Sequence, residues 1–159
     1  MTYDMGRQLA RGEKAERRLD KHFADRFHIT PVTREQQNQG IDRIFRHRKT
    51  GARYAIEYKT DWTAARTNNV FVETVSIDAQ NKRGWAYTCQ ADWLIYYVPD
   101  KRAIYILSLS TLRAELPRWL DHYAISPPVR NPGYNTRGIL VPLRDFRQCC
   151  QKIERMSWH

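Results

Sequence analysis

The sequence predicts an α/β fold in which a central sheet is flanked by helices. Three observations support this prediction. Apolar residues recur at four-residue spacing over residues 12–27, a pattern typical of a helix that packs on a core. Residues 41–48 and 53–60 are strand-like segments separated by a tight turn, which indicates a hairpin. Residues 92–98 are almost continuously apolar, as expected of a central strand that is buried on both faces.

The helix expected over residues 12–27 carries an apolar stripe and a carboxylate beside it. The stripe consists of Ala15, Leu19, Phe23 and Phe27. Glu16 precedes Leu19 by three positions, so it lies toward the buried side of the helix. A carboxylate that leans into a core needs a partner, or its pKa shifts. Glu16 therefore either forms a salt bridge with a nearby arginine or points toward a metal site.

The expected hairpin brings three charged residues together. Side chains alternate between the two faces of a strand, so Glu57 and Lys59 share one face, with their Cα atoms roughly 7 Å apart. Tyr58 points to the opposite face and into packing. The turn at residues 49–51 makes the two strands antiparallel, and this arrangement brings Asp42 near Glu57.

The rest of the chain is expected to complete a single domain over residues 1–159, with a core at about 12–109 and a C-terminal extension at 110–159. Further strands are expected at 28–34, 70–76, 103–109 and 139–143, and a short helical or irregular segment at 82–87. Helices are expected at 111–123, with Ser110 as the cap, and after residue 143 through 149–153. Loops are expected at 35–40, 61–69 and 126–138, the last of which holds three Pro and two Gly.

The charge balance indicates a polyanionic partner. The 159 residues include 27 Lys and Arg against 17 Asp and Glu, a formal net charge of +10 that is spread along the chain. A folded basic domain of this kind usually meets nucleic acid, and five Trp and nine Tyr could stack on bases. A basic surface that only keeps the protein in solution is the alternative. The candidate nucleic-acid contacts are Trp62, Arg66, Asn68, Arg130 and Arg137, all in expected loops.

The cysteines and the apolar segments indicate in which cellular compartment the protein is found. Cys89, Cys149 and Cys150 are odd in number and show no Cys-x-x-Cys spacing, so we expect reduced thiols and no zinc site. The N-terminus lacks the apolar segment of a signal peptide, and no apolar run approaches the roughly 18 residues that span a bilayer. We therefore expect a cytoplasmic protein without a membrane partner.

Asp42, Glu57 and Lys59 together suit the hydrolysis of a phosphodiester. Mg²⁺ prefers oxygen ligands and usually takes one or two carboxylates while it keeps several waters. Asp42 and Glu57 would supply the carboxylates, and the backbone carbonyl of Tyr58 could supply another ligand. Neighbouring carboxylates oppose the lowered pKa that Lys59 would need as a base, so we expect it to position the water and stabilise charge. The alternative is an exposed cross-strand salt bridge worth under about 1 kcal/mol.

This arrangement resembles the PD-(D/E)XK, or restriction endonuclease-like, nuclease superfamily over roughly residues 12–109. Asp42 corresponds to the first acid of the motif, Glu57-Tyr58-Lys59 to its second part, and Glu16 to an acidic residue on the preceding helix of many members. The motif's proline is absent, because Gly40-Ile41 precedes Asp42, and many members lack it too. The resemblance implies an αβββαβ core with a mixed central sheet, and Mg²⁺- or Mn²⁺-dependent cleavage of DNA or RNA.

We therefore expect a metal-dependent nuclease, with DNA favoured over RNA as the substrate. We favour an endonuclease, and one form that it could take is a structure-selective enzyme similar to Holliday-junction resolvases. The alternative is a non-catalytic nucleic-acid-binding protein that keeps the nuclease fold. Compact members of the superfamily often act as dimers, so the resemblance leaves a homodimer open. Glu73, in the strand expected at 70–76, either forms a salt bridge at the core edge or touches the site.

Overall fold

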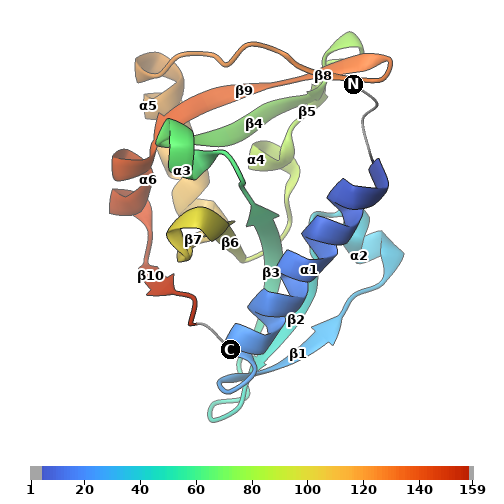
Figure 1. The fold of residues 1–159 in the computed structure, drawn as a ribbon, viewed down its shortest axis with the longest axis vertical. Helices are drawn as coiled ribbons and strands as arrows, with labels where there is room; N and C mark the ends of the chain where they lie inside the picture. The colour runs from blue at the N-terminus through green and yellow to red at the C-terminus, as the bar shows by residue number, and fades with distance from the viewer. Residues whose placement is uncertain (1–4, 158–159) are drawn as a thin grey trace.

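The computed structural model describes residues 5–157 as a mixed α/β structure with two sheets (Figure 1). The larger sheet has the order β1-β2-β3-β6-β7-β10, with bounds β1 (Phe27–Pro31), β2 (Arg43–His47), β3 (Arg53–Thr60), β6 (Trp93–Val98), β7 (Ala103–Ser108) and β10 (Lys152–Arg155). The smaller sheet has the order β5-β4-β9-β8, with bounds β5 (Lys82–Arg83), β4 (Asn69–Ile77), β9 (Tyr134–Pro142) and β8 (Val129–Asn131). The helices are α1 (Met5–Phe23), α2 (Arg34–Asn38), α3 (Ala64–Thr67), α4 (Trp85–Thr88), α5 (Leu109–His122) and α6 (Leu143–Cys149), with 3-10 turns η1 (Asp78–Gln80) and η2 (Pro99–Lys101). The predicted α/β class, a mixed central sheet with helices around it, is confirmed.

Strand β3 lies between an antiparallel and a parallel neighbour. It pairs antiparallel with β2 and parallel with β6, and the register places Glu57 beside Leu94 and Lys59 beside Tyr96. Parallel strands need a crossover connection. Here the crossover from β3 to β6 contains α3, β4, β5 and α4. Figure 1 shows α4 and β4 beyond the C-terminal end of β3, so this connection brings the second sheet to that end.

Different elements cover the two faces of the larger sheet. On one face, Leu19 of α1 belongs to a buried cluster with Tyr58 and Tyr97. On the other face, Leu94 and Tyr96 pack with buried residues of β4, β9, α5 and α6. β6 contributes to both clusters because its side chains alternate, which explains its continuous apolar sequence. Each large apolar side chain buried in this way contributes about 1.5–3 kcal/mol to folding.

Helix α1 differs from the expected helix at both ends. It spans Met5–Phe23 rather than residues 12–27, and the first three residues of the predicted stripe are buried as expected. Phe27, the fourth, begins β1 instead. Its ring centroid still lies 5.0 Å from that of Phe45, so it reaches the same core from a strand. Phe27 matched the four-residue spacing of the stripe because it packs in the same core, although it belongs to a strand.

The polar segment at residues 35–40, predicted as a loop, contains most of α2. Thr33 caps this helix: its hydroxyl accepts a hydrogen bond from the Gln36 backbone N–H, and the Gln36 side chain accepts one from the Thr33 N–H. Such a capping box satisfies two backbone donors at a helix start. Gly40 follows with a φ of +78°, a left-handed conformation that favours glycine, and leads the chain toward Asp42.

The segment at residues 126–138, predicted as a surface loop, forms most of a hairpin. β8 and β9 pair antiparallel around Gly133, whose φ is +83°. β9 also pairs with β4, and this distant partner extends the strand beyond the predicted residues 139–143. The helix expected to reach residues 149–153 ends at Cys149, and β10 then pairs with β7. Residues after 110 thus contribute strands to both sheets.

The three cysteines are free thiols, and the helices are too short or too polar to span a bilayer within residues 5–157. Cys89, Cys149 and Cys150 all carry free thiols. Cys89 is buried, and its Sγ donates a hydrogen bond to the Gly40 carbonyl at 3.1 Å. Among residues 5–157, no helix combines the length and the apolarity needed to cross a bilayer.

Candidate active site

Asp42 is held against the C-terminal half of β3. Its backbone N–H donates to the Ile56 carbonyl at 2.8 Å, which continues the pairing of β2 with β3. Its Oδ2 accepts a hydrogen bond from the Tyr58 backbone N–H, also at 2.8 Å. The antiparallel hairpin therefore places the Asp42 carboxylate at the same end of the sheet as Glu57 and Lys59. Asp42 lies near Glu57, as predicted, because its Oδ2 binds the N–H of Tyr58, the residue that follows Glu57.

Glu57 and Lys59 project from the same face of β3. The Lys59 Nζ lies 2.5 Å from Glu57 Oε1, a short ion pair between residues two positions apart. Glu57 is only 5% exposed, whereas a third of the Lys59 side chain is exposed. The two residues share this face with Ala55, and Tyr58 packs on the opposite face against the α1 cluster, as predicted.

Burial dominates the ionisation of Glu57. It raises the pKa of Glu57 to about 7, the Lys59 ammonium pulls that pKa down, and the neighbouring Asp42 carboxylate pushes it up again. Desolvation disfavours the charged form of an acid, and a second carboxylate nearby does the same. A cation placed between the two carboxylates would remove both penalties.

Lys59 remains protonated in this setting. Burial works against its charged form, but the carboxylates of Glu57, Asp42 and Glu73 outweigh burial and raise the pKa of Lys59. The pKa of Lys59 thus moves away from the lowered value that a neutral base needs, and the role of Lys59 stays a prediction. The Trp85 ring of α4 also faces the ammonium, with Nζ 5.7 Å from the ring centroid. Lys59 is therefore a fixed cation at the end of β3.

Glu16 of α1 satisfies parts of both interpretations given for it. Its carboxylate accepts a hydrogen bond from Arg43 Nη2 at 3.1 Å, so the expected salt bridge with a nearby arginine exists. Burial raises the pKa of Glu16, and the Asp42 charge raises it further, while Arg43 acts in the opposite direction. The Asp42 charge therefore acts on the Glu16 carboxylate, and Arg43 binds Glu16 from the side of Asp42. Arg43 Nη1 also donates to the Asp42 carbonyl at 2.9 Å.

Asp20 is a site-supporting residue that the sequence analysis missed. Its carboxylate accepts hydrogen bonds from Arg43 Nε at 3.1 Å and from the Tyr58 hydroxyl at 2.9 Å. Asp20 follows Glu16 by four positions, so both carboxylates lie on one face of α1. That spacing was the available signal. Asp20 thus binds Tyr58, which lies between Glu57 and Lys59 in β3, and Arg43, which directly follows Asp42.

Glu73 of β4 forms part of the wall that faces Lys59. Its Oε1 accepts a hydrogen bond from the Trp85 backbone N–H at 3.2 Å, at the start of α4. Burial raises the pKa of Glu73, and the Trp85 N–H, Lys59 and Lys82 oppose that increase. The backbone is close here: a Cβ on Gly84 would lie 2.5 Å from the Glu73 carbonyl oxygen. Glycine at this position therefore lets α4 approach β4 beside Lys59.

The five candidate nucleic-acid contacts lie in three different places. Trp62 packs against the α1 side of the sheet, and the Arg11 guanidinium carbon lies 3.6 Å from its ring centroid. Arg66 and Asn68 are exposed at α3, and Asn68 lines a surface depression with Lys101 and Arg144. The remaining two, Arg130 and Arg137, are exposed on the β8–β9 hairpin. The structure thus groups only the acidic residues and Lys59 into one site.

The residues present fit a hard divalent cation through the Asp42–Glu57 pair. Within residues 5–157 no cluster of three or more His, Cys, Asp or Glu side chains has metal-binding geometry. Mg²⁺ needs only one or two carboxylates, because waters complete its octahedral shell. The Tyr58 N–H is engaged by Asp42, which orients that peptide, and the contribution of its carbonyl stays a prediction.

No protein-family model matches the chain, and no curated protein or solved structure matches it either. The function must therefore be inferred from Asp42, Glu57 and Lys59 and from the residues that hold them in place.

Proposed function

We propose that this protein is a metal-dependent nuclease that hydrolyses phosphodiester bonds in nucleic acid, and that it acts as an endonuclease on DNA. The observation that carries the proposal is the buried Glu57 carboxylate, which lies beside Asp42 and in contact with Lys59 at one end of the sheet. Two carboxylates and a fixed ammonium at one point suit a negatively charged phosphate only if a cation joins them.

Each residue has a distinct role in this proposal. Asp42 and Glu57 would hold Mg²⁺ or Mn²⁺, which when bound lowers the pKa of water and neutralises charge on the phosphate oxygens. Lys59 orients the attacking water or stabilises the developing negative charge, since its raised pKa keeps it protonated. Glu16 assists indirectly, because Arg43 connects it to the Asp42 backbone.

The order of elements supports a relation to the PD-(D/E)XK nucleases. α1 precedes the antiparallel strands β1, β2 and β3, and β6 pairs parallel with β3 after a crossover. The first acid stands just before β2, and the Glu-x-Lys pair stands near the end of β3. The crossover departs from a simple helix, because it also contains β4 and β5.

The charge distribution supports nucleic acid as the partner. The net charge of +10 would attract a polyanion, and the attraction would weaken with salt. Lys82, Arg83, Arg130 and Arg137 are exposed on the second sheet, whose strand β4 carries Glu73 beside Lys59. We therefore expect this sheet to contact the nucleic-acid backbone next to the acidic residues.

The second candidate is a non-catalytic nucleic-acid-binding protein. The observation in its favour is that Glu57 and Asp42 already have partners in the chain: Lys59 Nζ at 2.5 Å and the Tyr58 N–H at 2.8 Å. Calorimetry with Mn²⁺ separates the two candidates. Binding heat in the wild type that disappears in Glu57→Ala supports the nuclease, whereas the absence of binding heat in both supports the salt-bridge protein.

Cleavage of plasmid and branched DNA with Mg²⁺ tests the proposal directly. Asp42→Ala and Lys59→Ala should each lower the rate by about 100-fold or more, the usual cost of losing one preorganised electrostatic group. Asp121→Ala on α5 and Lys49→Ala in the β2–β3 turn remove the same charges at exposed positions and serve as matched controls. Cleavage that persists equally in all four variants would exclude the assigned residues.

A further inference from the structure

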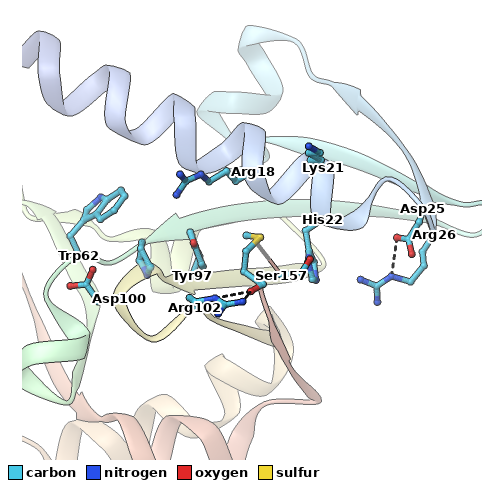
Figure 2. Close-up of a pocket in the computed structure, with 12 residues that line it drawn as sticks. Arg18, Lys21, His22, Asp25, Arg26, Trp62, Tyr97, Asp100, Arg102 and Ser157 are labelled. Carbon is cyan, nitrogen blue, oxygen red and sulfur yellow. Dashed lines mark hydrogen bonds and ion pairs between the residues drawn. The ribbon is translucent and has the colours of Figure 1, made fainter. Parts of the chain in front are cut away.

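A cavity of about 580 Å³ opens between the C-terminal half of α1 and the turn that joins β6 to β7 (Figure 2). Figure 2 shows Tyr97 of β6 below α1 at the floor of the cavity, and Met156 and Ser157, which follow β10, also line it. Trp62, which lines one end of the cavity, follows the C-terminal end of β3 and packs on the α1 face of the sheet. Cavities of roughly 300–1,000 Å³ are the size that small organic ligands occupy.

Two cations of α1 face this cavity without partners among the residues that the structure describes. Arg18 and Lys21 are exposed, and within residues 5–157 their side chains make no hydrogen bond or ion pair. Figure 2 shows the Arg18 guanidinium extending from α1 over the cavity toward Trp62. A guanidinium and an ammonium on one rim, one helical turn apart, are suited to a phosphate group.

The other cations at the cavity are already engaged. His22 Nε2 lies 2.6 Å from Glu154 Oε2, and Arg26 donates two hydrogen bonds to the same carboxylate at 2.6 and 2.8 Å. Arg102 donates to the Met156 carbonyl. These contacts fix the cavity wall and leave Arg18 and Lys21 as the groups available to an anion.

Acidic residues are confined to the two ends of the cavity. Figure 2 shows Asp100 near Trp62 and Asp25 at the far end beside Arg26. Asp25 Oδ1 lies 3.6 Å from Arg26 Nε, so its charge is partly balanced. The middle of the cavity therefore combines an aromatic and aliphatic surface with the two free cations of α1.

We propose that this cavity binds one nucleotide unit of a single-stranded segment in the nucleic-acid substrate. The base would lie beside the half-buried Trp62 ring, over a floor formed by the buried Tyr97 and Met156, and the phosphate would bind Arg18 and Lys21. Base–aromatic contact with a cationic rim is how proteins hold single strands without reading sequence. The inference rests on the proposed function for the strand as the ligand. It adds to the substrate an unpaired segment that is held on the α1 face of the larger sheet, opposite to the face that carries Glu57 and Lys59.

Binding of a short fluorescein-labelled oligothymidylate, measured by anisotropy in EDTA, tests the site without any cleavage. Arg18→Ala/Lys21→Ala should reduce the slope of log affinity against log salt by about 0.7, because the two side chains hold one phosphate and each single-strand phosphate contact contributes about 0.7. Arg17→Ala/Lys14→Ala removes the same two charges from exposed positions of α1 outside the cavity and should leave most of the slope in place. Trp62→Leu should weaken binding about fivefold or more.

Equal affinity and equal slopes in the two double variants would overturn the site. If Trp62→Leu does not fold, this comparison of exposed-residue variants still decides. Thymidine monophosphate as a competitor distinguishes the source of the nucleotide: weak competition supports a strand, whereas competition as tight as the oligonucleotide would assign the cavity to a free nucleotide and contradict the strand. Cleavage by these variants in Mg²⁺, compared with Asp42→Ala, tests the nuclease separately, because neither cavity cation touches Asp42 or Glu57.

Discussion

The Lys59 ammonium lies 2.5 Å from the carboxylate of Glu57, a side chain that is only 5% exposed. The ion pair does not keep Glu57 a normal acid, since burial and the Asp42 charge still raise its pKa to about 7. A buried carboxylate that is only half ionised at neutral pH weakens the folded protein unless a further cation joins it. In the proposed nuclease, a metal bound at Asp42 and Glu57 would therefore stabilise the fold.

Stability without metal should decrease as the pH rises. The folded-state pKa of Glu57, about 7, lies above its ordinary value of 4.5, so the folded protein binds the proton more tightly than the unfolded chain. That stabilising contribution is complete below pH 4.5 and is lost as the pH rises through 7. The loss should be on the order of 3 kcal/mol. Urea unfolding in EDTA at several values between pH 5 and 8 measures it.

Glu57→Gln should flatten this pH profile, because the amide does not titrate. Glu13→Gln is the matched control, since Glu13 lies on the exposed side of α1 with 60% of its side chain accessible. A wild-type profile that Glu57→Gln leaves unchanged would show that another group titrates.

Metal binding at neutral pH should release protons. Because Glu57 is partly protonated near pH 7 and a metal-bound carboxylate is ionised, Mn²⁺ must displace its proton. Calorimetric titrations at pH 6.5 in buffers of different ionisation enthalpy should give a proton release that disappears at pH 8.5. Asp42→Asn should abolish both the binding and the Mn²⁺-induced rise in melting temperature. For the wild type that rise should correspond to about 2.7 kcal/mol at a metal concentration of 100 Kd. Proton release that does not vary with pH would contradict the Glu57 assignment.

Arg43→Ala should destabilise the protein by about 2–4 kcal/mol. It removes the guanidinium that binds Glu16 and Asp20 and leaves both carboxylates partly buried near Asp42. Arg43→Lys keeps the charge but loses the planar fork, so it should recover only part of the loss. Denaturant unfolding measures both variants. Arg46→Ala on the exposed side of β2 is the control, and a loss equal to that of Arg43→Ala would show that the charge network is unimportant.

The contacts of Glu154 with His22 and Arg26 should hold β10 against the end of α1, and acid should weaken them. Burial favours its neutral form, but hydrogen bonds from Arg26, Lys152 and His22 outweigh burial and hold the pKa of Glu154 well below 4.5. The folded chain therefore binds this proton more weakly than the unfolded chain, so the contribution is present above pH 4.5 and disappears as the pH falls further. Hydrogen exchange of the β10 amides should accelerate on acidification. In Glu154→Gln the β10 amides should exchange fast already at pH 7. Slow exchange in this variant would show that Glu154 does not hold β10 in place.

The hairpin of the candidate site was predictable because its determinants are local. The bounds of β3 were predicted correctly, and the two-residue period of a strand was enough to place Glu57 and Lys59 on one face and Tyr58 on the other. The short turn then fixed the antiparallel register that brings Asp42 to β3. α2 was missed although its capping box, Thr33 with Gln36, is also local.

The sequence by itself thus determined the α/β class, the acidic pair with its lysine, and a basic chain suited to a polyanion. Only the tertiary structure decided which distant residues surround that pair. Asp20 contacts Tyr58 and Arg43 because α1 packs on the sheet beside them. Glu73 lies near Lys59 because the β3–β6 crossover brings β4 to the C-terminal end of β3. These contacts join segments far apart in the chain, and no local periodicity encodes how such segments pack. The state of Lys59 and Glu57, one fully charged and the other half neutral, follows from that packing.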